Sequence, residues 1–126
     1  MSNHSAYRTF VDRLSKTKDS AREKSTKKRK SLGLRTAREN LNDLVDPGSF
    51  LEFGAFAVAA QRNRRDYEEL QLETSADGIL TGFCNINEDE VGEDNSHAAA
   101  IIYDYSVLAG SQGFFHHQKL DRICEK

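Results

Sequence analysis

Residues 79–105 read ILTGFCNINEDEVGEDNSHAAAIIYDY, and this stretch decides the fold. Residues 79–86 have the composition of a β-strand, and residues 98–103 form a continuous apolar run typical of a buried strand. Residues 87–96 between them are polar and rich in Asp and Glu. The sequence therefore predicts a long hairpin with an acidic, solvated tip.

Polar side chains alternate in this tip as calcium ligands do in an EF-hand loop, at Asn85, Asn87 and Asp89. An EF-hand loop needs glycine at its sixth position, but Glu90 stands there, and helices are not expected on either side. We therefore expect a solvated turn and not a calcium site.

Upstream of the hairpin, the sequence predicts a short helix followed by a short strand. Thr36 and Glu39 have the spacing of a capping box at a helix start. Residues 46–48, Asp-Pro-Gly, end that helix because proline cannot continue the hydrogen-bond ladder. Residues 49–53 suit a strand, whereas residues 55–75 give mixed signals and predict a surface loop or short helix.

The first 31 residues are expected to form a basic helical arm, separate from residues 32–126. Its first part places apolar side chains on one stripe of an amphipathic helix, at Tyr7, Phe10, Val11 and Leu14. Residues 16–30 hold eight basic and two acidic residues, a net charge of +6. Two interpretations stay open for this segment: a solvated connector, or a surface that contacts anions.

Downstream of the hairpin, residues 110–113 (Gly-Ser-Gln-Gly) form a turn that feeds a helix over residues 114–126. Backbone N–H groups at such a turn and helix start favour phosphate, although many such connections bind nothing. His116 is expected to be packed and His117 exposed. The apolar face of this helix is unfinished at Lys126, so the chain looks cut at that point.

Composition excludes several classes of protein. The chain has 126 residues, a formal charge of −2 and 37% apolar residues. The apolar fraction is below the usual value of about 45–50%, so we expect one domain with a thin core.

Cys84 and Cys124 form no CxxC pair, and we expect two reduced, buried thiols rather than a disulfide or zinc ribbon. His116, His117 and Cys124 lack a fourth zinc ligand. The sequence shows no signal peptide and no apolar segment long enough to span a membrane, so a soluble protein is expected.

Three phrases, in this order, resemble one family. Residues 34–50, with Glu52, resemble the LTARERI…LLDPGSFVEL opening of the biotin-dependent carboxyltransferases. Residues 76–82 (ADGILTG) resemble their ADGVVTG strand, and residues 103–113 (YDYSVLAGSQG), with His116 and Lys119, resemble QDFTVLGGSLGEVHAEK. The resemblance covers about residues 32–126, and the first part of this stretch is similar to acetyl-CoA and propionyl-CoA carboxylase β-type subunits. Residues 57–65 and residues 103–113 look closer to the carboxyltransferase part of long single-chain acyl-CoA carboxylases.

The resemblance implies an α/β fold class: N-terminal helices followed by the first β-β-α turn of a crotonase/ClpP-like spiral, incomplete in this chain. It also implies transfer of a carboxyl group from carboxybiotin to an acyl-CoA through an enolate held in an oxyanion hole. In the family, the loops of that hole lie farther along the chain than residue 126. We therefore expect the N-terminal part of a carboxyltransferase domain, with no catalytic residue of its own and inactive alone.

By the same resemblance, residues 106–113 are expected to receive the CoA nucleotide. The candidate contacts are Ala109, Gly110 and Ser111. Lys119 is a further candidate, whose ammonium would attract a phosphate group of the nucleotide. Arg38 is either a further contact or a brace between helix and sheet. Ala109 stands where the family usually has glycine. No metal is implied, because the zinc ribbon of some relatives is missing.

The resemblance also implies which molecules surround the chain. No cofactor is expected on the chain itself; biotin, as carboxybiotin on a carrier domain, and acyl-CoA are implied. The expected partners are the rest of the carboxyltransferase and the biotin carboxylase and biotin carrier domains. The expected compartment is the cytoplasm, with the mitochondrial matrix left open.

Two other hypotheses remain at this stage. The first is a non-catalytic interaction or anion-binding module that uses the basic segment 16–30, although this segment lacks the interleaved aromatic residues common in nucleic-acid binders. The second is a remnant that self-associates or assembles with a larger subunit through exposed apolar faces, at Tyr7, Phe10, Leu14, Leu120 and Ile123. Membranes and nucleic acids are not expected partners of a carboxyltransferase segment.

Overall fold

The computed structural model describes residues 3–125, so residue 126 and the predicted end of the last helix lie outside the described residues. The described chain contains one antiparallel sheet with the strand order β1-β2-β3. The strands are β1 (Leu51–Phe53), β2 (Ile79–Asn85) and β3 (His97–Tyr103). Ile79 lies opposite Tyr103 and Asn85 opposite His97. The hairpin and the short strand predicted from the sequence are confirmed.

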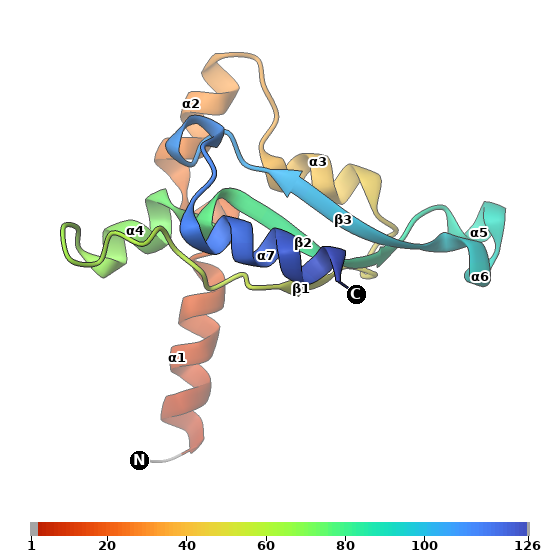
Figure 1. The fold of residues 1–126 in the computed structure, drawn as a ribbon, viewed down its shortest axis with the longest axis horizontal. Helices are drawn as coiled ribbons and strands as arrows, with labels where there is room; N and C mark the ends of the chain where they lie inside the picture. Colours follow the sequence, from red (N-terminus) through yellow and green to blue (C-terminus); the bar gives the residue numbers. More distant parts are fainter. Residues whose placement is uncertain (1–2, 126) are drawn as a thin grey trace.

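Helices cover both faces of this sheet. α3 (Ala37–Leu44) packs on the face that holds Leu80 and Ala100. α7 (Phe114–Cys124) crosses the other face over β2 (Figure 1). Because successive strand residues point to opposite faces, Ile79 and Thr81 lie on the α7 side. Both of these residues are fully buried.

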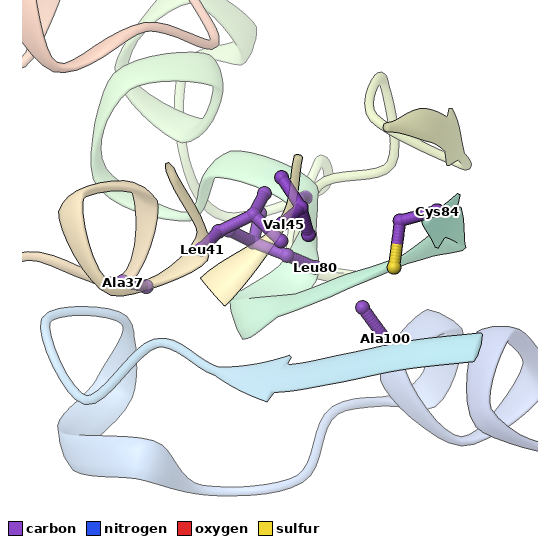
Figure 2. Packing of buried hydrophobic residues seen from close by; sticks show 7 residues of the cluster. Ala37, Leu41, Val45, Leu80, Cys84 and Ala100 are labelled. Carbon is purple, nitrogen blue, oxygen red and sulfur yellow. The ribbon is translucent and has the colours of Figure 1, made fainter. Parts of the chain in front are cut away.

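The core under α3 is built from small and medium apolar side chains, as Figure 2 shows. Its buried members are Ala37, Leu41, Val45, Ala76, Leu80, Cys84 and Ala100. A smaller cluster of Val58, Ala59 and Leu70 lies beside α4 (Tyr67–Glu73). The core is thin, as the low apolar content of the sequence predicts.

The prediction that residues 98–103 are a buried strand is wrong in part. β3 is an edge strand of the described sheet, and α7 lies over its neighbour β2. Ile101 and Tyr103 are therefore 39% and 44% exposed, while Ala100 on the opposite face is buried.

The acidic tip of the hairpin projects from one end of the molecule (Figure 1). It contains two short helices, α5 (Glu88–Val91) and α6 (Glu93–Ser96), where the sequence predicted only a turn. The carboxylate of Asp46 accepts hydrogen bonds from the backbone N–H groups of Asn87 and Glu88, at 2.8 and 3.0 Å. Within residues 3–125, His, Cys, Asp and Glu side chains form no group of three or more placed to hold a metal ion.

The N-terminal helix α1 (Asn3–Ser15) projects away from the sheet (Figure 1). The predicted amphipathic helix is confirmed, but its apolar stripe stays largely uncovered, with Tyr7 and Phe10 67% and 51% exposed. Phe10 contacts Phe56 with a ring-centroid distance of 5.9 Å.

A short 3-10 helix (Asp19–Ala21) separates α1 from α2 (Glu23–Ser31), which carries the basic segment. The interpretation of this segment as a solvated connector is wrong at Thr17 and Arg22, which are buried. Arg22 contacts Leu72 and Asp104, far along the chain.

Two smaller expectations have different outcomes. Cys84 is a buried free thiol, as predicted, but Cys124 is exposed because it lies at the end of α7. Residues 67–73 form the helix α4, which confirms the short helix in the mixed segment.

The helices described between residues 3 and 125 include none that is long and apolar enough to cross a membrane.

The capping box predicted at Thr36 is confirmed and supplies a first test. The Thr36 hydroxyl accepts from the Glu39 N–H at 3.0 Å and donates to the Asp19 carboxylate at 2.6 Å. Thr36→Ala removes both bonds, so we expect the free energy of unfolding, measured in urea, to fall by about 1–2 kcal/mol. Thr36→Ser keeps the hydroxyl and is expected to lose less than half of that. Equal losses in the two variants would contradict a capping role.

Candidate functional site

The turn between β3 and α7 has a strained backbone. Leu108, Ala109 and Gly110 follow one another with φ values of 47°, 54° and 78°. Side chains on L-residues disfavour this left-handed region by roughly 1–2 kcal/mol each, and only Gly110 avoids that cost. The turn is closed by two backbone hydrogen bonds, Gly110 N–H to Val107 O at 3.0 Å and Ser111 N–H to Leu108 O at 3.1 Å.

A pocket of about 490 Å³ lies between this turn and the basic helix α2. Tyr105, Leu108 and Ala109 line it from the turn, and Leu72 and Glu73 line it from α4. Helix α2 contributes cationic side chains, namely Lys24, Lys28 and Arg29. The pocket lining therefore combines apolar side chains with four basic and two acidic ones, a net positive charge.

The cations of this pocket differ in how they are paired. Lys24 lies 3.6 Å from the Glu73 carboxylate, and Arg65 pairs with Glu69 and Glu73. The Arg29 guanidinium donates to the Arg35 carbonyl at 3.0 and 3.1 Å and lies 5.9 Å from the Tyr105 ring centre. Lys28 is exposed and forms no ion pair with the residues described.

The three candidate contacts of the turn differ in whether they line the pocket. Ala109 lines the pocket, and Gly110 and Ser111 directly follow it in the chain without lining it. The signal that the sequence analysis used, a glycine-rich turn after a strand, thus marks one wall of a real pocket. The basic side chains of α2 form the facing wall, and they were not assigned to this site from the sequence.

Lys119 lies away from this pocket, although the sequence analysis grouped it with the turn. Its side chain is buried, and the ammonium donates to the carbonyls of Ala76, at 2.8 Å, and Ile79. Burial lowers the pKa of Lys119 from 10.5 to about 8, against the opposing effect of Glu52 and Asp77. This cation holds the backbone at the start of β2.

Arg38 lies in a different part of the fold. Its guanidinium makes a bidentate pair with Glu52 of β1, with both N···O distances at 3.0 Å. Its Nε donates to the Thr17 carbonyl at 2.8 Å. Of the two roles considered from the sequence, this geometry is that of a brace between α3 and the sheet. Arg38 also lines a second, larger cavity of about 830 Å³ beside Phe10 and Phe50.

A second left-handed turn, which the sequence analysis did not predict, lies beneath α7. Ala76, Asp77 and Gly78 have φ values of 56°, 47° and 79°. Asp77 is 1% exposed, and its Oδ2 accepts from the His116 backbone N–H at 2.9 Å. The carboxylate therefore caps the N-terminus of α7, where the helix dipole favours negative charge. A Cβ on Gly113 would lie 2.6 Å from Asp77 Oδ1, so this position requires glycine.

His116 is fully buried and His117 is exposed, as predicted. The His116 ring has its Nδ1 at 3.1 Å from the Asp77 carbonyl and lies 4.7 Å from the Tyr103 ring. Burial lowers the pKa of His116, although its hydrogen bond to Asp77 acts in the opposite direction. The histidine is thus a packing residue that ties α7 to the turn at Asp77.

Several proteins with similar sequences or structures are named for the carboxylation of acyl-CoA or for carboxyl transfer. The chain is 33% identical over 114 residues to the biotin-dependent long-chain acyl-coenzyme A carboxylase β4 subunit of Mycobacterium tuberculosis, a match that covers 90% of this chain. A single-chain, multi-domain long-chain acyl-CoA carboxylase superimposes with a TM-score of 0.91 at 45% identity over 95% of this chain. The transcarboxylase 12S core, solved as a hexamer with methylmalonyl-CoA, gives a TM-score of 0.76 at 28% identity over 99% of this chain. No protein-family model matches the chain.

These relatives are much longer than the chain. The match covers 19% of the mycobacterial subunit, 12% of the single-chain carboxylase and 22% of the transcarboxylase 12S chain. The similarity therefore concerns one segment of each relative.

The buried ammonium of Lys119 leads to a pH-dependent prediction. Its pKa of about 8 in the folded chain lies below its ordinary value of 10.5, so between these pH values the unfolded chain binds more protons. This group therefore makes the free energy of unfolding rise from pH 8 to pH 10.5, by up to about 3 kcal/mol. Below pH 8 the lysine is protonated in both states, so it does not contribute to the pH dependence of the free energy of unfolding. We expect Lys119→Met to lose this rise in urea titrations at successive pH values.

The matched control is Lys27→Met, because Lys27 is an exposed lysine of α2. This variant is expected to keep the full pH dependence of the unaltered chain. If Lys119→Met and the unaltered chain show parallel stability curves between pH 8 and 10.5, the ammonium is not buried as described.

Proposed function

The chain belongs to the carboxyltransferase family of biotin-dependent acyl-CoA carboxylases, and on this premise we propose that it supplies the nucleotide-binding part of an acyl-CoA site. The α/β fold class predicted from the sequence is confirmed. N-terminal helices precede a β-β-α unit made of β2, β3 and α7, and the chain corresponds to part of the crotonase-like carboxyltransferase fold.

The reaction that we propose for the whole protein is transfer of a carboxyl group from carboxybiotin to the α-carbon of an acyl-CoA. Because the chain spans only 12–31% of the length of its relatives, we assign no catalytic residue within it. Carboxybiotin would supply the carboxyl group, and we propose no contact to it from residues 3–125. By itself the chain is expected to be inactive.

The observation that carries this proposal is the pocket between α2 and the strained turn. Its volume of about 490 Å³ falls in the range of small-molecule sites. The exposed ammonium of Lys28 and the guanidinium of Arg29 suit phosphate groups, while Leu72, Tyr105 and Leu108 offer apolar surface to an adenine ring. A CoA nucleotide carries both kinds of group. Ala109 contacts it in this proposal, with Gly110 and Ser111 continuing the turn beside it.

Lys119 and Arg38 take indirect roles in this proposal. Lys119 supports the backbone under α7, and Arg38 ties α3 to β1 through Glu52. Neither side chain needs to leave its partners for the pocket to bind a nucleotide. Of the two interpretations of the basic segment, the proposal favours the anion-contacting surface at Lys28 and Arg29.

The partners that we propose are the rest of the carboxyltransferase, a biotin carboxylase and a biotin carrier domain. Relatives of the chain include subunits of carboxylases and a multi-domain single chain, which supports a larger assembly. The hypothesis of a non-catalytic anion-binding module has no support from these similarities. A cytoplasmic or mitochondrial compartment stays a prediction. Self-association through apolar faces also stays a prediction, but only for the face of α1 with Tyr7 and Phe10, because Ile123 of α7 is buried and not exposed as expected.

The division of the chain at residue 31 also stays a prediction. Arg22, which lies in the proposed arm (residues 1–31), bonds to Leu72 and Asp104 of the remainder (residues 32–126). We propose that the two parts act together, since both line the same pocket.

A titration of the ¹⁵N-labelled chain with coenzyme A tests the proposed site. We expect saturable shifts of the amide resonances of residues 105–112. Lys28→Glu places a negative charge at the pocket, so it should weaken binding by roughly 3- to 10-fold.

Lys27→Glu is the matched control, because Lys27 is the exposed neighbour that does not line the pocket. It should change the affinity less than 2-fold at an ionic strength of about 0.15 M, where distant charges are screened. Equal losses in the two variants, or shifts confined to residues around Arg38, would refute this placement of the nucleotide.

A further inference from the structure

We infer that Arg22 is a positioning residue, which holds the left-handed turn 108–110 in place through Asp104 and Ser106 without touching the ligand. The inference rests on the proposed function for its link to CoA, but the effect on the turn itself is independent of any ligand. Arg22 does not line the pocket, although its neighbours Ala21 and Lys24 do.

The guanidinium of Arg22 joins the start of α2 to two other segments, the end of α4 and the residues that follow β3. Its Nε donates to the Leu72 carbonyl at 2.7 Å, and its Nη1 donates to Asp104 Oδ2 at 3.1 Å. Its Nη2 donates to the Ser106 hydroxyl at 3.2 Å. Arg22 is only 7% exposed, whereas the basic residues Lys24, Lys27 and Lys28 that follow it in α2 are exposed. Arg22 therefore belongs to the interior of the fold.

Asp104 transmits this contact to the turn. Its Oδ1 accepts from both the backbone N–H and the hydroxyl of Ser106, at 2.9 and 2.6 Å. Its own carbonyl accepts from the Val107 N–H at 3.1 Å, and Val107 is 1% exposed. The backbone entering the turn is thus fixed up to Val107.

The strained residues themselves have little to hold them. Leu108 is 41% exposed and Ala109 is also exposed, so packing of their side chains cannot enforce positive φ angles. A strained backbone persists only where surrounding structure determines it. The fixed residues 104–107 on one side and α7 on the other are therefore the source of the restraint.

Arg22 also fixes the position of α2, the helix that forms the pocket wall opposite the turn. Arg22 is the N-cap residue of α2, the helix that carries Lys28 and Arg29. Its side chain ties the start of α2 to the end of β3, so the two walls are fixed relative to each other. A lysine at this position has one ammonium on a flexible stem and cannot reproduce a planar fork toward three acceptors.

Arg22→Lys in the full chain tests the inference, with Arg64→Lys as the control because Arg64 is exposed. Without ligand, we expect amide hydrogen exchange at Gly110 and Ser111 to accelerate at least 10-fold. The Ala109 ¹³C shifts should lose the pattern of a left-handed residue, and the exchange rates of β2 should stay unchanged. A merely structural role would accelerate exchange in β2 as well. With coenzyme A as the probe, the dissociation constant should rise about 10-fold, and Arg64→Lys should change neither measurement.

Ser106→Ala is the second variant, which keeps the inference testable if Arg22→Lys does not fold. It removes the hydroxyl contacts and keeps the Arg22–Asp104 pair, so we expect a smaller acceleration at the same amides. Unchanged exchange at Gly110 and Ser111 in a folded variant would overturn the inference, and so would acceleration spread over β2. If the unaltered chain does not bind coenzyme A, the proposed function fails, while the exchange data still decide the role of Arg22.

Discussion

The buried left-handed turn at residues 76–78 is the constraint on which the rest of the structure depends. Its Asp77 carboxylate caps α7 through the His116 N–H, and its Ala76 carbonyl accepts from Lys119 of the same helix. Its Gly78 carbonyl accepts from the Asp104 N–H at 2.8 Å, just before the left-handed turn at residues 108–110. One short segment therefore fixes both α7 and the end of β3, and through them the pocket wall at Ala109.

Cationic side chains divide into two groups with different physical roles. Lys119 and Arg22 are 8% and 7% exposed, and each bonds to backbone carbonyls, which offsets the cost of burying charge. Arg38 is partly buried, and it pairs with the Glu52 carboxylate and donates to the Thr17 carbonyl. Lys28 stays in solvent at the edge of the pocket. In this account the buried cations set the geometry, and the exposed cation attracts the phosphate groups of the ligand.

The parts of the fold that follow from local patterns were predictable from the sequence. The composition of residues 79–86 predicted β2, the Thr36 to Glu39 spacing predicted the start of α3, and the 3.6-residue period placed His116 inside. Other features depend on distant contacts. Burial of Arg22 and Lys119 has no local signal, because the acceptors of both side chains lie at least 40 positions away in the sequence. For the same reason Ile101 could not be recognised as an edge-strand residue. The positive φ angles at Ala76 and Leu108 have no local signal either, because neither alanine nor leucine favours that backbone region.

Intermolecular nuclear Overhauser effects between coenzyme A and a methyl-labelled chain test the central claim most directly. The account predicts contacts from the adenine protons to the methyl groups of Leu108 and Ala109, in the pocket beside α2. Contacts to Leu41 and Val45, which line the larger cavity beside α1 and α3, would contradict it. So would a bound coenzyme A with no contact to residues 108–109.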